Sequence, residues 1–328
     1  MLKKSIKVGT IEIKNRLVMP PMATEKSTDE GTVTDELCDY YRKRTEGGYI
    51  GLVITEHSFV SQEGKASKRQ LSISRDSDVE GLKKLVDTIH LTGTKVIAQI
   101  NHAGSAADRE ITGEEAVGVS GVRHPRKKSA ALPRELTLEE IKELEEKYVL
   151  AAVRAKKAGY DGVEIHSAHS YFLNQFYSPL TNRRNDEYGP QSIENRVRAH
   201  VEIIRKVRAA VGSDYPIALR LGGCDYMDGG STIDDAVKAC MIFEKEGVDL
   251  LDISGGMCGY IIDADYPGYF RDMTIKIKEN VSVPVILTGG IVTSDEAEEL
   301  LEDGYADMIG VGRAIFRDEN WAKNNMDR

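Results

Sequence analysis

Cysteine is scarce in this sequence. Its four copies, Cys38, Cys224, Cys240 and Cys258, show neither close pairing nor metal-ligand spacing. They are therefore predicted to be free thiols in a reducing compartment. No apolar run reaches the length of a membrane-spanning helix. Residues 1–17 alternate charged and apolar side chains and lack a small-residue cleavage site, so no signal peptide is expected and a cytoplasmic protein is predicted.

Basic residues are outnumbered, since 44 Lys and Arg stand against 53 Asp and Glu and leave a net charge of −9. Such a chain repels phosphodiesters and anionic lipids, so neither nucleic acid nor membrane is an expected partner. A small-molecule substrate is expected instead, and homo-oligomerisation is left open. The 328 residues suffice for a large core, and barrels of this length commonly form one unit. We therefore expect a single domain over residues 1–328.

Short β-branched runs alternate with longer amphipathic segments along the whole chain. The runs are mostly too apolar for a half-exposed sheet and are typical of parallel strands buried on both faces. Eight strands are predicted: Leu17–Met22, Gly51–Thr55, Lys95–Ile100, Gly162–Ile165, Ile217–Leu221, Leu250–Ile253, Val285–Leu287 and Met308–Val311.

Helices are predicted between these strands. In the third, Thr137 and Glu140 form a capping-box pattern ahead of apolar residues at helical spacing. Eight strand–helix units in series predict a (β/α)8 TIM barrel. The predicted helices are Thr34–Thr45, Val79–Thr92, Leu138–Ala158, Ile193–Val211, Ile233–Glu246, Asp272–Asn280 and Asp295–Glu302.

Three stretches are longer than ordinary connections: Ala103–Leu136, Ser167–Ser192 and Gly255–Arg271. Each follows the C-terminal end of a predicted strand, which is the face where barrels build their active sites. Long loops there are typical of functional segments.

Strands seven and eight end in Thr288-Gly289-Gly290-Ile291 and Gly310-Val311-Gly312-Arg313. Glycines let backbone amides approach an anion, and the guanidinium of Arg313 matches phosphate geometry. This is where barrels commonly hold a phosphate. The alternative is that these glycines only turn the chain.

Histidines gather after strand four, where His166 and His169 lie three residues apart and Tyr171 follows. Two ring nitrogens in one turn can address a single oxygen, with a phenol close by. A zinc site competes with this interpretation, because His57 and His102 follow strands two and three. Strands one and eight end without a ligand, so no metal is expected.

Two polar residues sit on strands that are otherwise apolar: Gln99 on strand three and Arg220 on strand five. Their burial requires polar partners. A planar heterocycle with imide and carbonyl groups would satisfy both. A carboxylate such as Glu164 is an alternative partner for Arg220.

The most specific motif is Val163-Glu164-Ile165-His166-Ser167-Ala168-His169-Ser170-Tyr171, followed by Ser178-Pro179-Leu180, Asn182-Arg183-Arg184, Asp186-Glu187-Tyr188-Gly189 and Ser192-Ile193-Glu194-Asn195-Arg196. With Lys14-Asn15-Arg16-Leu17-Val18-Met19-Pro20-Pro21-Met22 near the start and Gly312-Arg313 near the end, it resembles the old yellow enzyme family of FMN-dependent ene-reductases. The resemblance covers nearly the whole chain.

The resemblance implies FMN as cofactor, NADH or NADPH as hydride donor, and reduction of an activated carbon–carbon double bond. It implies that His166 and His169 bind the substrate carbonyl and that Tyr171 donates the proton. The cofactor-binding residues that it implies are Pro20, Pro21, Met22, Ala23, His57, Gln99, Arg220, Gly289, Gly290, Gly312 and Arg313.

Several departures from the family pattern bear on these expectations. Ala23 stands where relatives often have Cys or Thr, and Glu25 and Lys26 follow where some relatives place an active-site tyrosine. Pro190-Gln191 opens the usual glycine-rich turn before Ser192. The chain ends soon after Trp321, without the iron–sulfur motif and second nucleotide-binding domain of larger relatives, which predicts a single-flavin form.

Two rival functions stay open. A phosphate-binding aldolase or isomerase would use the same glycines, but the strand ends offer neither a Schiff-base lysine nor paired carboxylates. An amine or alcohol dehydrogenase of the same family is the alternative redox chemistry.

Overall fold

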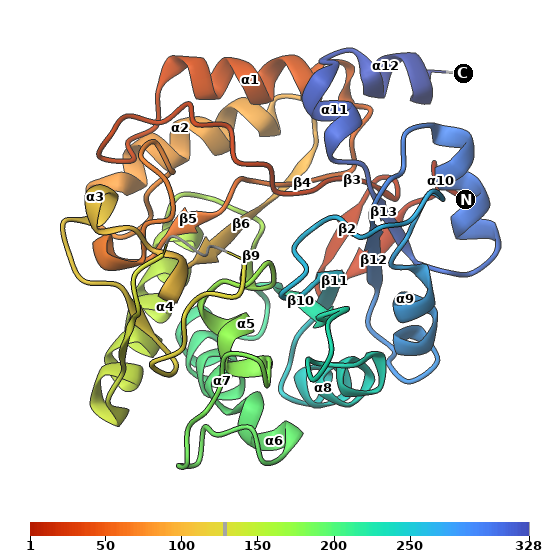
Figure 1. Ribbon diagram of the computed structural model, residues 1–328. Coiled ribbons are helices and arrows are strands. Elements are labelled where there is room, and N and C mark those ends of the chain that lie inside the picture. The colour runs from red at the N-terminus through yellow and green to blue at the C-terminus, as the bar shows by residue number, and fades with distance from the viewer. Residues whose placement is uncertain (127–129, 328) are drawn as a thin grey trace.

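The computed structural model describes residues 1–126 and 130–327, and in these a closed parallel barrel is surrounded by helices (Figure 1). Strands β3 to β13 pair in the order β4-β3-β13-β12-β11-β10-β9-β6, and an added β4–β6 pairing closes the ring. This confirms the predicted (β/α)8 TIM barrel. Its strands are β3 (Leu17–Met19), β4 (Leu52–Ile54), β6 (Lys95–Asn101), β9 (Gly162–Ser167), β10 (Ile217–Cys224), β11 (Leu250–Gly255), β12 (Val285–Thr288) and β13 (Met308–Gly310).

Helices lie between successive barrel strands, as predicted, and two further helices follow the last strand. Thr137 and Glu140 form the expected capping box at the start of α4. The helices are α1 (Asp35–Thr45), α2 (Asp78–His90), α4 (Leu138–Lys157), α7 (Arg198–Val211), α8 (Ile233–Lys245), α9 (Arg271–Lys278), α10 (Ser294–Glu302), α11 (Arg313–Arg317) and α12 (Trp321–Met326).

Several predicted boundaries were wrong by two or more residues; for example, β10 extends to Cys224 and not only to Leu221. The first strand ends at Met19 and not at Met22, because Pro20 and Pro21 have no N–H to donate to a neighbouring strand. The predicted helix Ile193–Val211 is broken at Val197 into α6 (Ile193–Arg196) and α7.

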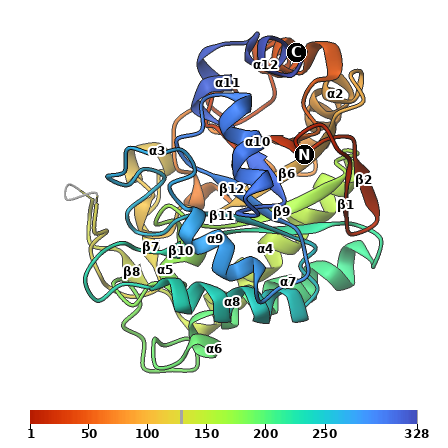
Figure 2. The same ribbon diagram turned by 90° about the vertical axis from the view of Figure 1, so that its right-hand side faces the viewer.

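A hairpin of β1 (Ile6–Val8) and β2 (Ile11–Ile13) closes the N-terminal end of the barrel. Its Val8 and Ile13 pack in one cluster with the first inward-facing residues of the strands, among them Ile97, Ala218 and Leu250. In Figure 2 this hairpin lies at one side of the molecule, and the loop that carries α3 (Arg109–Thr112), β7 (Val117–Gly118) and β8 (Arg134–Glu135) lies at the other. The N-terminal end is therefore plugged, and the C-terminal face is left for the long loops.

The remaining short elements also lie in connections. They are β5 (Ser58–Phe59), α5 (Phe172–Tyr177) and the 3-10 turns at Glu46–Gly48, Gln62–Gly64 and Gly104–Ala106. No helix among the described residues is long and apolar enough to cross a bilayer.

Candidate active site

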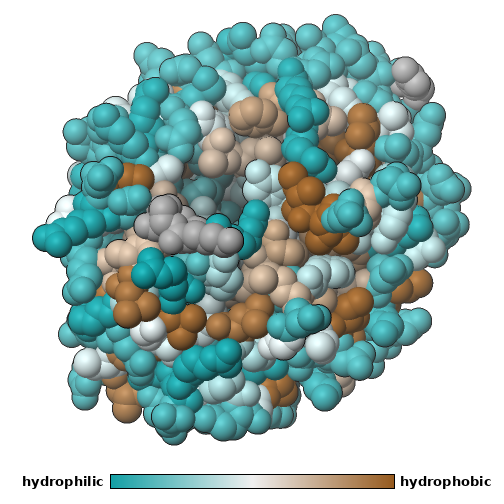
Figure 3. Space-filling view, in the orientation of Figure 1, coloured by the Kyte–Doolittle hydropathy of each residue, from teal (hydrophilic) through white to brown (hydrophobic). Residues whose placement is uncertain are grey.

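A cavity of about 740 Å³ opens at the C-terminal face of the barrel, and Figure 3 shows the hollow at the centre of that face. Its volume lies within the range of small-molecule sites. All fourteen residues that the resemblance assigns to catalysis or cofactor binding line it: Pro20, Pro21, Met22, Ala23, His57, Gln99, His166, His169, Tyr171, Arg220, Gly289, Gly290, Gly312 and Arg313. The structure thus brings the set together, while the role of each residue remains a prediction.

The alternation of side chains along the strands produces the polar floor of this cavity. Ile97, Ala218 and Leu250 face the barrel interior in the apolar layer against the hairpin. Two residues further along the same strands, Gln99, Arg220 and Asp252 face inward in the next layer, because the side-chain period of a strand is two. The barrel interior therefore has an apolar layer at its closed N-terminal end and a polar layer above it, directly beneath the cavity.

Buried carboxylates partner the polar residues of the floor. Arg220, only 5% exposed, forms an ion pair with Asp252, with 3.1 Å between Nε and Oδ2. The amide Nε2 of Gln99 donates to Oε1 of Glu164 at 2.7 Å. Burial raises the pKa of Asp252 to about 6 and that of Glu164 well above its usual value, and the charge of Arg220 opposes both shifts. The sequence-based alternative, Glu164 as the ion-pair partner of Arg220, is corrected here to Asp252.

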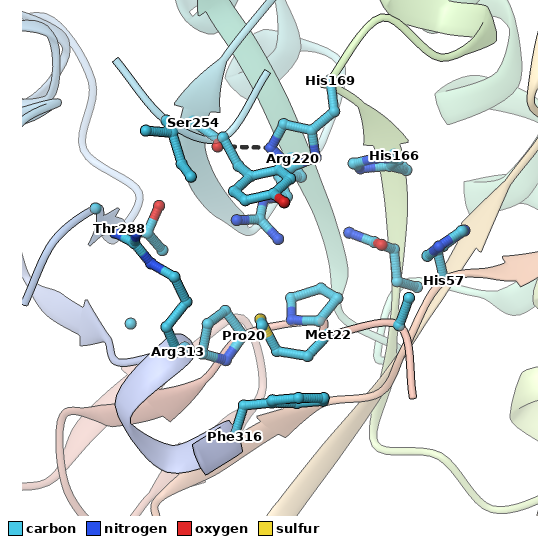
Figure 4. A pocket seen from close by; sticks show the side chains of 18 of the residues that line it. Pro20, Met22, His57, His166, His169, Arg220, Ser254, Thr288, Arg313 and Phe316 are labelled. Carbon is cyan, nitrogen blue, oxygen red and sulfur yellow. Dashed lines mark hydrogen bonds between the residues drawn. The ribbon is translucent and has the colours of Figure 1, made fainter. Parts of the chain in front are cut away.

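Four side chains at the C-terminal ends of β9 and β4 form an aromatic cluster at one end of the cavity. The ring of His166 lies 5.2 Å from that of His169 and 5.4 Å from that of Tyr171, and His57 lies 5.4 Å from Tyr171. Ser254 contacts Nε2 of His169 at 2.7 Å (Figure 4). The buried Nδ1 of His166 has no hydrogen-bond partner within residues 1–126 and 130–327.

The backbone after β9 adopts an uncommon conformation that places this cluster. His169 and Ser170 have φ of 58° and 64°, the left-handed region that few L residues enter. Asn174 accepts the N–H of Ser170 at 2.9 Å, and Gln175 donates to its carbonyl at 2.8 Å. These two hydrogen bonds from α5 stabilise the strained turn and so fix the position of His169 and Ser170.

All three imidazoles of the cluster are neutral at physiological pH. Burial, with the charge of Arg220 contributing, lowers the pKa of His166 and His169 well below the usual value, and burial lowers that of His57 to about 4. Burial also raises the pKa of Tyr171 to about 12, so its phenol keeps its proton. The cluster offers N–H and O–H donors and no charge.

The other end of the cavity combines glycines with a guanidinium. Gly289 and Gly290 have φ of 113° and 73°, and a Cβ at Gly289 would lie 2.6 Å from the ring of Tyr269. The hydroxyl of Tyr269 accepts from Nη2 of Arg313 at 3.3 Å. Figure 4 shows Arg313 and Thr288 on the opposite side of the cavity from His57 and His166. No Asp or Glu among the described residues pairs with Arg313.

These features fit a planar heterocycle that carries a phosphate. The floor presents a buried amide and guanidinium, one end presents neutral donors with an unpartnered buried nitrogen, and the other presents Arg313 beside glycines. FMN has this combination of groups. Within the described residues, no group of three or more His, Cys, Asp or Glu is arranged to hold a metal.

Sequence reasoning missed several lining residues. The floor residue Asp252 is a polar residue inside the predicted apolar strand Leu250–Ile253, which was a usable signal. Ser254 lies one residue beyond the predicted end of that strand. Tyr269 comes from the long loop after β11, and no local pattern marks it. The other missed lining residues include Arg126, Tyr260, Ile261, Phe316 and Arg317.

The family profile of the NADH:flavin oxidoreductase / NADH oxidase family matches residues 2–326. The chain belongs to this family. The resemblance to old yellow enzymes is thereby confirmed, as is the expectation of FMN as the cofactor of the family. The zymomonas mobilis homologue of old yellow enzyme has the same fold, with a TM-score of 0.86 and 27% identity over 98% of this chain and 91% of the other.

Curated relatives of this family member differ in length. An "NADH oxidase" of Thermoanaerobacter brockii is 40% identical over 97% of this chain, which spans only 49% of that relative. An "NADPH dehydrogenase" of Bacillus subtilis is 36% identical over 97% of this chain and 92% of its own length. The expectation of a single domain therefore stays a prediction, as do the oligomeric state and the cytoplasmic location.

Proposed function

We propose that this chain is an FMN-dependent reductase that takes hydride from NADH or NADPH and delivers it to an activated carbon–carbon double bond, as in an α,β-unsaturated carbonyl compound. The observation that carries the proposal is the convergence of His166, His169 and Tyr171 at one end of the cavity. The ring of His166 lies 5.2 Å from that of His169 and 5.4 Å from that of Tyr171. When bound, FMN supplies reversible storage of the hydride between donor and acceptor.

The residues of the barrel would hold the cofactor. Arg313 and the glycines at the ends of β12 and β13 would bind the phosphate, because they provide a forked cation and open backbone. Gln99 and Arg220 would face the pyrimidine edge of the ring system. Pro20 to Ala23 line the cavity without a side-chain hydrogen-bond donor, so they would contact the ring system through apolar surface.

The cluster would act on the acceptor. Negative charge builds on the carbonyl oxygen as hydride reaches the β-carbon, so N–H donors from His166 and His169 would act mainly in the transition state. Their neutral state leaves these donors without the solvation cost of a buried cation. Tyr171, protonated at neutral pH, would give its proton to the α-carbon.

The names of the relatives support the proposed hydride donor more than the proposed hydride acceptor. "NADH oxidase" and "NADPH dehydrogenase" both specify a reduced nicotinamide, and neither specifies an organic acceptor. The acceptor class therefore rests on the side chains that surround this cavity.

The test is Tyr171→Phe, which keeps the packing of the ring and removes only the proton. Positioned proton transfer typically contributes roughly 10²–10⁴-fold in rate. We expect oxidation of the reduced holoenzyme by an enone to slow by about that factor in stopped-flow absorbance. Reduction of the flavin by NAD(P)H should stay near the parental rate.

Nitroalkenes provide the control, because the nitronate formed from them is stable and can leave before it is protonated. Hydride transfer to a nitroalkene should survive the Tyr171→Phe change. If the variant reduces enones at the parental rate, Tyr171 is a packing residue and another group supplies the proton. If the parent reduces no activated alkene at all, the proposed function is wrong.

A further inference from the structure

Positive charge gathers in the cavity although the chain as a whole has a net charge of −9. Four arginines line the cavity, Arg126, Arg220, Arg313 and Arg317, and no Asp or Glu does so within residues 1–126 and 130–327. A concave site lined by one sign of charge concentrates ligands of the other sign. The cavity is therefore suited to an anionic organic molecule.

Two of these arginines already have a partner in the site. Arg220 forms its ion pair with Asp252 in the floor, and Arg313 donates to Tyr269 at the glycine end. The guanidinium of Arg126 makes no hydrogen bond or ion pair to any other residue that the structure describes. An exposed cation without a partner, on a cavity wall, is available to a ligand.

Arg126 lies at the histidine end of the cavity. Its guanidinium rests against the turn at Gly259, where a Cβ would lie 1.8 Å from Nη1. The next residue along, Tyr260, has its ring 5.8 Å from the ring of His169. The charge of Arg126 also contributes to the lowered pKa of His169. Arg126 is thus close to the donors assigned to the acceptor.

Apolar surface lies beside this arginine. Tyr260 and Ile261, which also line the cavity, are 56% and 49% exposed. Such surface can cover the carbon skeleton of a ligand between its carbonyl and a charged end. A ligand that spans from His169 past Tyr260 would bring its far end to Arg126.

We propose that Arg126 binds a carboxylate or phosphate carried by the acceptor, at the end remote from the carbonyl that His166 and His169 bind. The inference rests on the proposed function, and it narrows the substrate class to unsaturated carbonyl compounds with an anionic tail. The forked guanidinium suits either anion by two parallel hydrogen bonds. The phosphates of NAD(P)H share this chemistry and are the other source of an anion in the same cavity.

The test compares two enones that differ in one group: 4-phenyl-3-buten-2-one and its para-carboxylate. Binding of each to the oxidised holoenzyme is titrated by the change in flavin absorbance, without any donor, and turnover is then measured with both. In Arg126→Gln, Kd and KM for the carboxylate should rise roughly tenfold, the effect of losing a charge-assisted hydrogen bond. The neutral enone should change less than about twofold, and kcat should be unchanged.

Two further variants separate a specific contact from general charge. Arg126→Lys should restore part of the affinity for the carboxylate, because it restores the charge without the fork. Arg123→Gln removes the same charge from the same segment, but Arg123 donates to the carbonyl of Ala130 and does not line the cavity. It should therefore leave the ratio of the two affinities unchanged.

A parallel measurement identifies the source of the anion. The reductive half-reaction is followed with NADH and with NADPH in the parent and in Arg126→Gln. If Arg126→Gln weakens the binding of NADH or NADPH and leaves the binding of both enones unchanged, the assignment of Arg126 to the acceptor is overturned. Equal effects on the neutral and carboxylated enones would overturn it as well. If neither enone is reduced but the carboxylate still binds in an Arg126-dependent way, the proposed function fails and the anion site stands.

Discussion

Replacing Gly289 by alanine tests the contact between Tyr269 and the glycine end of the cavity. Gly289 has a φ of 113°, and the new Cβ would lie 2.6 Å from ring carbons of Tyr269. A positive φ costs an L residue roughly 1–2 kcal/mol. Forcing extra volume against a packed ring costs about 1–3 kcal/mol. The free energy of unfolding of Gly289→Ala should therefore fall by about 3 kcal/mol.

Gly304 is the matched control, because it has a φ of 79° and a Cβ there would meet nothing within 4 Å. Gly304→Ala should show only the backbone cost, about 1–2 kcal/mol. Urea unfolding of the apoprotein, followed by circular dichroism, measures both variants. Tyr269→Ala in each background completes the cycle, and the cost of Gly289→Ala should drop to that of Gly304→Ala when the ring is absent.

Two results would refute this reasoning. One is a Gly289→Ala variant no less stable than Gly304→Ala, which would mean that Tyr269 moves away without cost. The other is a cost that persists in full when Tyr269 is alanine, which would place the strain in the backbone alone.

Three other predictions concern charge. Arg313→Ala should weaken FMN retention by about 1.5–3 kcal/mol, measured as the Kd of the apoprotein for FMN; unchanged retention would remove Arg313 from the phosphate site. Arg220→Met should lower the midpoint potential of the bound flavin, because a cation there favours the reduced anion; a dye-linked titration that shows no change or a rise would refute its placement. Burial lowers the pKa values of His57 and His102 to about 4. Their contribution to stability is therefore complete above the unfolded pKa near 6.5 and is lost as the pH falls toward 4, by up to about 1.4 kcal/mol per pH unit for each imidazole. Unfolding titrations that show equal stability at pH 7 and pH 5 would contradict this.

The eight barrel strands were predictable because strands buried on both faces need continuous apolar runs, and these runs stand out between helices with caps and closing glycines. The N-terminal hairpin was missed, although Ile6, Val8, Ile11 and Ile13 alternate around a turn at Gly9. That alternation was the signal, since one face of the hairpin packs into the barrel.

The site was predictable to the extent that it stands on strand ends. Gln99, Arg220 and Gly289 follow directly from strand register, which places the C-terminal ends of parallel strands at one face. Tyr269 and Arg126 come from long loops, whose paths depend on tertiary contacts with Gly289 and Gly259. No periodicity along the chain encodes those contacts.

This division between strands and loops has a consequence for function. The residues assigned to the cofactor, such as Gln99, Arg220 and Arg313, stand on or directly after barrel strands whose pairing fixes their positions. The residues assigned to the far end of the acceptor, Tyr260 and Arg126, stand on loops that can change without disturbing the barrel. Flavin and donor chemistry should therefore follow from family membership, whereas the acceptor must be determined from the loop residues of each chain. In this chain the loops place a cation without a described partner beside two neutral histidines, which favours an acceptor that is both a carbonyl compound and an anion.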